Sequence, residues 1–175
     1  ASSLAGTAVS LTPARASMAA TVAEEDMGND AALDALLPTA LARSDAAGAR
    51  EHFEHDVVAW LTTVAPDGRV QSSLISFLPD GPDIVFYSQP DAPKIRNIAA
   101  SPRVSFHLQS DHMGDHMLIV EGTAEIDRSI PPMDVHSRYR MKYAEPHEHW
   151  GLDFTNTARD FSLPIRIRPT RVRIA

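Results

Sequence analysis

The chain has 175 residues, a formal net charge of −7 and no cysteine. Its length suits one domain with a single core. The acidic balance argues against a general binder of nucleic acid or of anionic membranes, since both surfaces require a basic face. The absence of cysteine excludes disulfides, thiolate catalysis and cysteine-ligated metals, and it is compatible with the cytoplasmic location that we expect. No apolar run approaches the roughly 20 residues of a membrane-spanning helix.

The start of the chain differs in composition from the rest. Residues 1–30 are rich in Ala, Ser and Thr, and they lack the basic start and solid apolar core of a signal peptide. We expect an N-terminal extension over residues 1–30 and one domain over residues 31–175. Ala and Leu dominate residues 31–55, which predicts two short helices separated at Pro38.

A β-meander is predicted next. Residues 57–64, 70–78 and 83–88 are rich in β-branched and aromatic residues, as is typical of strands. The turn-forming stretches Pro66-Asp67-Gly68-Arg69 and Pro79-Asp80-Gly81-Pro82 separate them. Two short connections in succession indicate antiparallel neighbours.

A helix over residues 91–100 is expected after the meander. Asp91 is a reasonable N-cap, and Pro93 is tolerated in the first turn. Pro102 ends this helix, because the residue before a proline is biased away from helical conformation.

The next segment combines strands and helices. Strands are predicted over residues 104–109 and 116–126, the second with a bulge or bend at Gly122. Residues 132–144 are predicted to form a helix, and residues 145–161 are expected to be irregular or helical.

The last segment, Ser162–Ile174, alternates apolar residues with arginines. The arginines are Arg166, Arg168, Arg171 and Arg173. This pattern predicts a strand with one apolar and one cationic face and a kink near Pro169. The cationic face could bind a polyanion, but we favour a solvated face paired with Asp and Glu. In total the pattern predicts a mostly β fold of about six antiparallel strands with peripheral helices, arranged as a barrel or sandwich.

The stretch YSQPDAPKIRN, residues 87–97, places two cations near the start of a helix. Cations there are mildly unfavourable, so a bound anion is one physical reason for Lys94 and Arg96. Ser88, the exposed N–H groups of the helix start and Lys94 could converge on one phosphate. The alternative is a solvated helix start.

Histidines form a second group of candidates. His112, Asp115 and His116 have metal-ligand spacing but fall in a predicted polar loop, so we expect a solvated loop and no metal site. A second cluster, His147, Glu148 and Trp150, could form a lid near the cofactor of a partner subunit. The sequence identifies no catalytic residue.

Several motifs together resemble a known family. The run Val85-Phe86-Tyr87-Ser88, then Lys94, then Ser101-Pro102-Arg103-Val104-Ser105 resembles the flavin-binding core of the pyridoxamine-phosphate-oxidase-like split β-barrel superfamily. The fuller set, with residues 60–64, 66–69, 120–124 and 164–173, looks like the branch that uses the deazaflavin coenzyme F420. The resemblance covers roughly residues 45–175 and implies a split β-barrel fold.

The resemblance also implies a cofactor site. It places the ring system near Ser72, Leu74, Ile75 and Ser76, and the phosphate near Tyr87, Ser88, Lys94 and, as a weaker match, Asn97. It implies a homodimer with the cofactor at the subunit interface. The implied activity is hydride transfer from reduced F420 to a small unsaturated organic substrate.

The chain departs from the family pattern at four positions. Flavin-binding oxidases of the superfamily place an arginine at Ser72 and a basic pair at Pro93-Lys94, so one FMN-type phosphate ligand is missing. The deazaflavin branch often has Pro and Trp at Leu74 and Ser76. An FMN-dependent oxidase or reductase and a non-catalytic flavin or haem binder therefore stay open as alternatives.

Overall fold

The structure is a computed structural model that describes residues 33–109 and 114–174. The extension expected over residues 1–30 lies outside the described residues, and the domain over residues 31–175 remains a prediction. Among the residues described, no helix is long and apolar enough to span a membrane.

Helices α3 (Leu36–Leu41) and α4 (Ala47–His55) precede the sheet in the described part of the chain, with the 3-10 helix η2 (Ser44–Ala46) between them. The prediction that Pro38 separates two helices is wrong. Pro38 lies in the first turn of α3, where its missing N–H removes no helical hydrogen bond. The chain instead leaves the helical conformation at Arg43, which is extended at φ −64° and ψ 148°.

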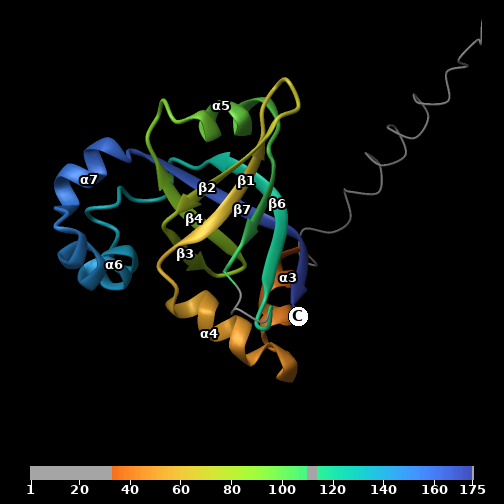
Figure 1. The fold of residues 1–175 in the computed structure, drawn as a ribbon. Coiled ribbons are helices and arrows are strands. Elements are labelled where there is room, and N and C mark those ends of the chain that lie inside the picture. The colour runs from red at the N-terminus through yellow and green to blue at the C-terminus, as the bar shows by residue number, and fades with distance from the viewer. Residues whose placement is uncertain (1–32, 110–113, 175) are drawn as a thin grey trace, which may run out of the picture. The chain divides into compact units, whose positions relative to one another are not determined.

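Seven antiparallel strands form one sheet in the order β2-β1-β5-β6-β7-β4-β3. They are β1 (Ala59–Val64), β2 (Val70–Ile75), β3 (Phe77–Asp80), β4 (Asp83–Ser88), β5 (Arg103–His107), β6 (Leu118–Ile126) and β7 (Leu163–Ile174). Strands β2 and β3 lie at opposite ends of this order, although Ser76 alone separates them in the chain. The sheet must therefore curl until its ends approach each other, and Figure 1 shows this curvature. The predicted mostly β split barrel is confirmed.

The seventh strand comes from a break that the sequence did not indicate. Residues 70–78 were predicted as one strand, which is wrong, because Ile75 pairs with Ala59 of β1 whereas Phe77 pairs with Phe86 of β4. The chain changes partners at Ser76. Strand β3 then runs on through the expected turn, which shrinks to two residues with Gly81 at a φ of 64°.

The bulge predicted at Gly122 is confirmed. The register between β6 and β7 shifts between Glu121 and Gly122. A Cβ atom on Gly122 would lie 2.4 Å from the carbonyl oxygen of Arg168, so the approach of β7 requires glycine here. Pro169 pairs with Gly122 at this point, and the expected kink takes the form of a bulge within a continuous β7.

Three more helices cover the barrel: α5 (Pro93–Ala100), α6 (Ser137–Trp150) and α7 (Phe154–Asp160). Helix α6 begins later than the predicted 132–144, because the His136 side chain caps it by accepting a hydrogen bond from the Tyr139 N–H. It continues through Pro146 and ends at Gly151, which has a φ of 64°. In Figure 1, α6 and α7 lie together on one flank of the barrel, with α5 at one end and α3 and α4 at the other.

The sheet carries a core on each face of β4. Ile84 and Phe86 point into the main core inside the barrel. Val85 and Tyr87 belong to a smaller core beneath α6 and α7. Successive strand residues face opposite sides, so β4 is apolar on both faces.

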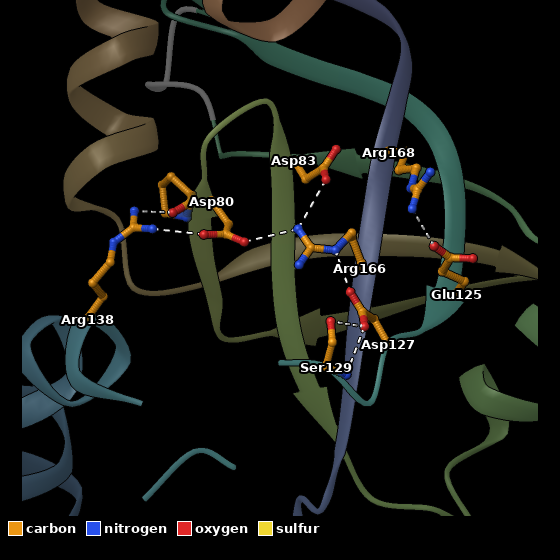
Figure 2. A network of polar contacts seen from close by, with 9 residues as sticks. Asp80, Asp83, Glu125, Asp127, Ser129, Arg138, Arg166 and Arg168 are labelled. Carbon is orange, nitrogen blue, oxygen red and sulfur yellow. Dashed lines mark hydrogen bonds and ion pairs between the residues drawn. The ribbon is translucent and has the colours of Figure 1, made fainter. Parts of the chain in front are cut away.

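An ion-pair network crosses the outer surface of β7, β4 and β3 (Figure 2). The Arg166 guanidinium contacts Asp80, Asp83 and Asp127 at 3.0, 3.1 and 2.7 Å. Hydrogen bonds from Ser129 and Arg166 lower the pKa of Asp127 to about 2. Arg168 pairs with Glu125 and Arg173 with Glu121 as well, so Arg166, Arg168 and Arg173 of β7 are each paired with carboxylates.

Helix α6 is fixed to the strand break through Tyr143. This side chain is fully buried, and its hydroxyl accepts a hydrogen bond from the Phe77 N–H at 2.7 Å. The same hydroxyl lies 2.7 Å from the Val57 carbonyl and 2.8 Å from the Phe77 carbonyl, to which its proton can be donated. One side chain thus satisfies backbone groups both at the break and just before β1.

We predict that Tyr143→Phe lowers the free energy of unfolding by about 2–3 kcal/mol, because it leaves buried backbone groups unpaired. Chemical denaturation of the parent and the variant measures this difference. Tyr139→Phe is the control on the same helix face and should cost less. Equal stability of Tyr143→Phe and the parent would contradict the role given to Tyr143.

Lys142, the second lysine of the chain, is partly exposed, but its Nζ is buried. Its Nζ lies 3.9 Å from the centroid of the Phe77 ring and has no hydrogen-bond partner among the described residues. Burial lowers the pKa of Lys142 to about 8, although the charge of Asp56 acts in the opposite direction. Protonated Lys142 therefore costs stability in the folded protein.

We predict that the free energy of unfolding rises between pH 8 and about 10.5, because the unfolded chain binds a proton at Lys142 that the folded protein has released. Lys142→Met should remove this increment and should not be less stable than the parent at pH 7. Denaturation midpoints for both proteins across this pH range measure the effect. Parallel curves for the two proteins would show that Lys142 titrates normally in the fold.

Candidate cofactor cavity

A cavity of about 230 Å³ lies beside the junction of β2 and β3. Leu74, Ile75 and Ser76 line it from the junction itself, whereas Tyr87 and Lys94 come from the end of β4 and the start of α5. These are five of the eight residues that the resemblance places at a cofactor. The fold brings them together because the chain changes partner strands at Ser76. Their role as cofactor ligands remains a prediction.

The opposite wall of the cavity comes from the two helices on the flank. Tyr139, His147 and Trp150 line it from α6, and Thr157 and Phe161 from α7 and its C-terminal end. The sequence suggested His147 and Trp150 as a lid but missed Tyr139. The spacing of the buried residues of α6, four residues from Tyr139 to Tyr143 and four more to His147, is the signal that marks this helix face.

Lys94 is the one cationic side chain that lines this cavity, and none of its other lining residues is acidic. Its Nζ forms no ion pair with any described residue. Burial lowers the pKa of Lys94. A half-buried lysine without a carboxylate partner suits an anionic ligand group.

The rest of the helix start differs from the sequence expectation. Asp91 was predicted as the N-cap, which is wrong, because Ala92 occupies that position without a side-chain cap. Pro93 at the first helical position holds the preceding residue in an extended conformation, with a ψ of 139°. The Arg96 guanidinium turns back and donates to the Asp91 carbonyl at 2.8 Å, so only Lys94 of the two cations faces the cavity.

The other three predicted ligands lie outside the cavity lining. Ser72 pairs with Thr62 across the hairpin, and their hydroxyl oxygens are 2.8 Å apart. Ser88 is fully buried and donates to the Gln89 carbonyl at 3.2 Å. Asn97 faces another concavity. The predicted roles of Ser72 and Ser88 stay predictions.

A second concavity, of about 790 Å³, lies between the β1–β2 turn and α5. Asn97 lines it, and its amide donates to Thr63 Oγ1 at 3.0 Å and to Gln71 Oε1 at 3.1 Å. These bonds tie α5 to the hairpin and occupy the amide. Arg69, which also lines this concavity, forms an ion pair of 2.7 Å with Asp67.

Three tyrosines form a connected cluster under the cavity. Tyr139 stacks on Tyr143 with ring centroids 4.3 Å apart, and Tyr87 meets Tyr139 edge-on at 5.0 Å. The Tyr87 hydroxyl donates to the Pro131 carbonyl at 2.6 Å. Burial raises the pKa of Tyr139 to about 12, partly offset by a hydrogen bond with Ser76, so it stays neutral at physiological pH.

The loop histidines do not gather around a metal in the part of the chain that is described. No group of three or more His, Asp or Glu residues there could hold an ion. The His116 ring lies 6.1 Å from the His52 ring and occupies the space where a side chain on Gly48 would fall. His112 lies outside the described residues.

Comparison with known proteins identifies the family. Residues 46–173 match the sequence profile of pyridoxamine 5′-phosphate oxidase, which is more than half of the chain. No match was found among curated protein sequences.

Solved structures share the fold. A putative pyridoxamine 5′-phosphate oxidase from Listeria innocua is 24% identical with a TM-score of 0.54, over 74% of this chain and 96% of its own. An F420 reductase is 26% identical with a TM-score of 0.54, over 71% of this chain and 94% of its own. HutZ, a haem storage protein from Vibrio cholerae, is 18% identical with a TM-score of 0.53, over 71% of this chain and 90% of its own.

Proposed function

The chain belongs to the pyridoxamine 5′-phosphate oxidase family, and from this premise we propose that it is an oxidoreductase that uses coenzyme F420. When bound, the reduced deazaflavin supplies a hydride, here to an electron-poor double bond of a small organic substrate. The residues of the chain bind and orient the two molecules and keep water from the reacting atoms. The alternative is an FMN-dependent oxidase or reductase on the same fold.

The observation that carries this proposal is the unpaired cation at one end of an aromatic cavity. Lys94 has no acidic neighbour among the residues that line the cavity, so a ligand phosphate would supply the missing charge. Leu74, Ile75 and Ser76 offer backbone groups beside it, and the side chain of Ser76 is small. Because β2 pairs only with β1 among the described residues, the N–H and C=O groups on its outer edge could face the polar edge of a ring.

The size of the cavity supports a shared site. Its volume of about 230 Å³ falls below the roughly 300–1,000 Å³ of ligand pockets, so one subunit would hold only part of a nucleotide-like cofactor. Four exposed apolar residues surround its mouth: Val58, Leu74, Trp150 and Leu152. Apolar patches of this kind mark interaction surfaces, and we propose that a second copy of the chain covers them in a homodimer.

Two observations favour F420 over FMN. The F420 reductase among the solved structures is 26% identical to this chain. In addition, Ser72 stands where flavin-binding oxidases of the superfamily place an arginine, and its hydroxyl is bonded to Thr62. The chain therefore offers one phosphate-binding cation fewer than an FMN-type site.

Titration of the purified protein with F420 and with FMN tests the proposal, with Trp150 at the cavity as the fluorescent reporter. We expect F420 to bind with a Kd in the micromolar range or below and FMN to bind at least about tenfold more weakly. Tighter binding of FMN than of F420 would favour the FMN-dependent alternative. Binding of neither cofactor would contradict the proposed function.

We predict that Lys94→Ala weakens F420 binding about 10- to 100-fold, because it removes a charge-assisted contact to phosphate. The matched control is Arg96→Ala, two residues along the same helix, whose guanidinium is bonded to the Asp91 carbonyl. Isothermal titration of both variants measures the difference. If Lys94→Ala bound F420 as tightly as the parent does, the assignment of a cofactor phosphate to this end of the cavity would be wrong.

A second candidate function is non-catalytic binding of haem. The observation in its favour is a buried histidine, His147, in the wall of the cavity. HutZ shares only the fold with this chain, and the cavity of one subunit is small for a porphyrin. Haemin titration followed by its Soret absorbance separates this candidate from the redox enzyme, which should show no saturable shift.

A further inference from the structure

A further cavity, of about 350 Å³, lies between the C-terminal end of α4 and the strands β1 and β2. We call it the α4 cavity. Its volume falls within the roughly 300–1,000 Å³ of small-molecule sites. Asp56, His52, Trp60 and Gln109 supply its polar and aromatic groups, and four aliphatic residues complete the lining. A mainly apolar wall with a few polar groups is typical of a ligand site.

The α4 cavity carries one carboxylate without a lysine or arginine partner. Asp56 is the one acidic residue among the described residues that line it, and its side chain is 31% exposed, so a ligand can reach it. Burial lowers the pKa of Lys142 and the charge of Asp56 raises it. Lys142 Nζ nevertheless lies over the Phe77 ring and has no hydrogen-bond partner among the described residues. Asp56 is therefore paired only with the His52 imidazole in the described part of the chain.

His52 adds a second hydrogen-bond acceptor to this cavity. Its Nδ1 lies 3.2 Å from each carboxylate oxygen of Asp56. Because an ionised carboxylate only accepts hydrogen bonds, Nδ1 carries the proton, and Nε2 of the neutral ring is an acceptor. Trp60 contributes an indole, whose electron-rich face attracts cations. These groups together suit a ligand that brings N–H donors and a positive charge.

The α4 cavity adjoins the candidate cofactor cavity but has the opposite charge. Val58 and Leu74 line both cavities, and the other lining residues differ. Lys94 is the cation of the cofactor cavity, whereas Asp56 is the anion of the α4 cavity. A ligand selected by Asp56 is therefore chemically distinct from a cofactor that carries phosphate.

We propose that the α4 cavity is a separate binding site for an organic cation that carries a primary ammonium group on an apolar body. The ammonium group donates hydrogen bonds to the Asp56 carboxylate beside the Trp60 indole, and the apolar body packs against Val57, Val58 and Leu74. The inference goes beyond the proposed F420-dependent function and does not rest on it, because Asp56 does not line the cofactor cavity.

The two tryptophans of the chain allow the two cavities to be observed separately. Trp60 lines the α4 cavity and Trp150 lines the cofactor cavity. Their indole N–H signals in a ¹H–¹⁵N correlation spectrum report on one cavity each, and the variants Trp60→Phe and Trp150→Phe assign these signals.

The probe is 2-cyclohexylethylamine, which is protonated at pH 8. We expect it to shift the Trp60 signal in a saturable way and to leave the Trp150 signal in place. Two molecules of similar size, the neutral 2-cyclohexylethanol and the anionic 3-cyclohexylpropionate, should bind at least about tenfold more weakly, because neither brings a positive charge to Asp56. This comparison uses the parent protein and requires no variant to fold.

The variant Asp56→Asn keeps the size of the side chain and removes its charge. We expect it to bind the amine about 10- to 100-fold more weakly in calorimetric titrations. Glu54→Gln is the matched control, since Glu54 is exposed on α4 outside the cavity lining and the change in net charge is the same. Trp60→Leu should weaken binding about two- to fivefold through loss of the indole face.

Three results would each overturn the inference. They are a Trp60 signal that the amine does not move, an alcohol that binds as tightly as the amine, and an Asp56→Asn variant that binds the amine as tightly as Glu54→Gln. A saturable Trp60 shift in a protein that binds neither F420 nor FMN would support this site and refute the proposed function alone. F420 binding without a Trp60 shift by the amine would do the reverse.

Discussion

The hydroxyl of Tyr143 is the contact on which the arrangement of sheet, helix and cavity depends. It binds the backbone where the chain leaves β2 and enters β3, and also the carbonyl of Val57 just before β1. A strand that changes partners exposes backbone groups in the middle of a core, and such groups are costly unless they are paired. By pairing them, one tyrosine permits the break at Ser76, and the break in turn permits the sheet to close into a split barrel.

The same contact connects the fold to the candidate site. Tyr143 lies at the centre of the buried face of α6, one turn from Tyr139 and one turn from His147, so fixing it places both neighbours at the cavity. At the other end of β3, Arg138 of α6 pairs with Asp80, which also contacts Arg166 (Figure 2). Helix α6 is thus attached to the barrel at two points, Arg138 and Tyr143.

Local chemistry was sufficient to predict much of the fold. Gly68 and Gly81 mark the hairpin turns, with positive φ values, and alternation along β7 identifies its buried face. Gly122 marks the bulge because no larger residue fits against β7. The break at Ser76 was not predictable in this way. No glycine or proline marks it, and its cause is the contact with Tyr143, which lies 66 residues away from Phe77 in the chain.

The residues of the candidate site were likewise only partly predictable from the sequence. Residues 74–76, Tyr87 and Lys94 were assigned from the resemblance to the family, and they line one cavity. Tyr139 was missed and His147 appeared only as one member of a lid, since their position depends on how α6 packs and not on local pattern. The helix was predicted to end at residue 144, whereas α6 continues to Trp150 and carries His147 into the wall.

The central claim is that the break between β2 and β3 creates the place where the cofactor binds, and a crystal structure with oxidised F420 tests it most directly. We predict that the deazaflavin ring lies against residues 74–76 and that a phosphate oxygen lies about 3 Å from Lys94 Nζ. It would be contradicted by a cofactor seated in the concavity beside Arg69 and Asn97, with the cavity at Ser76 left to solvent.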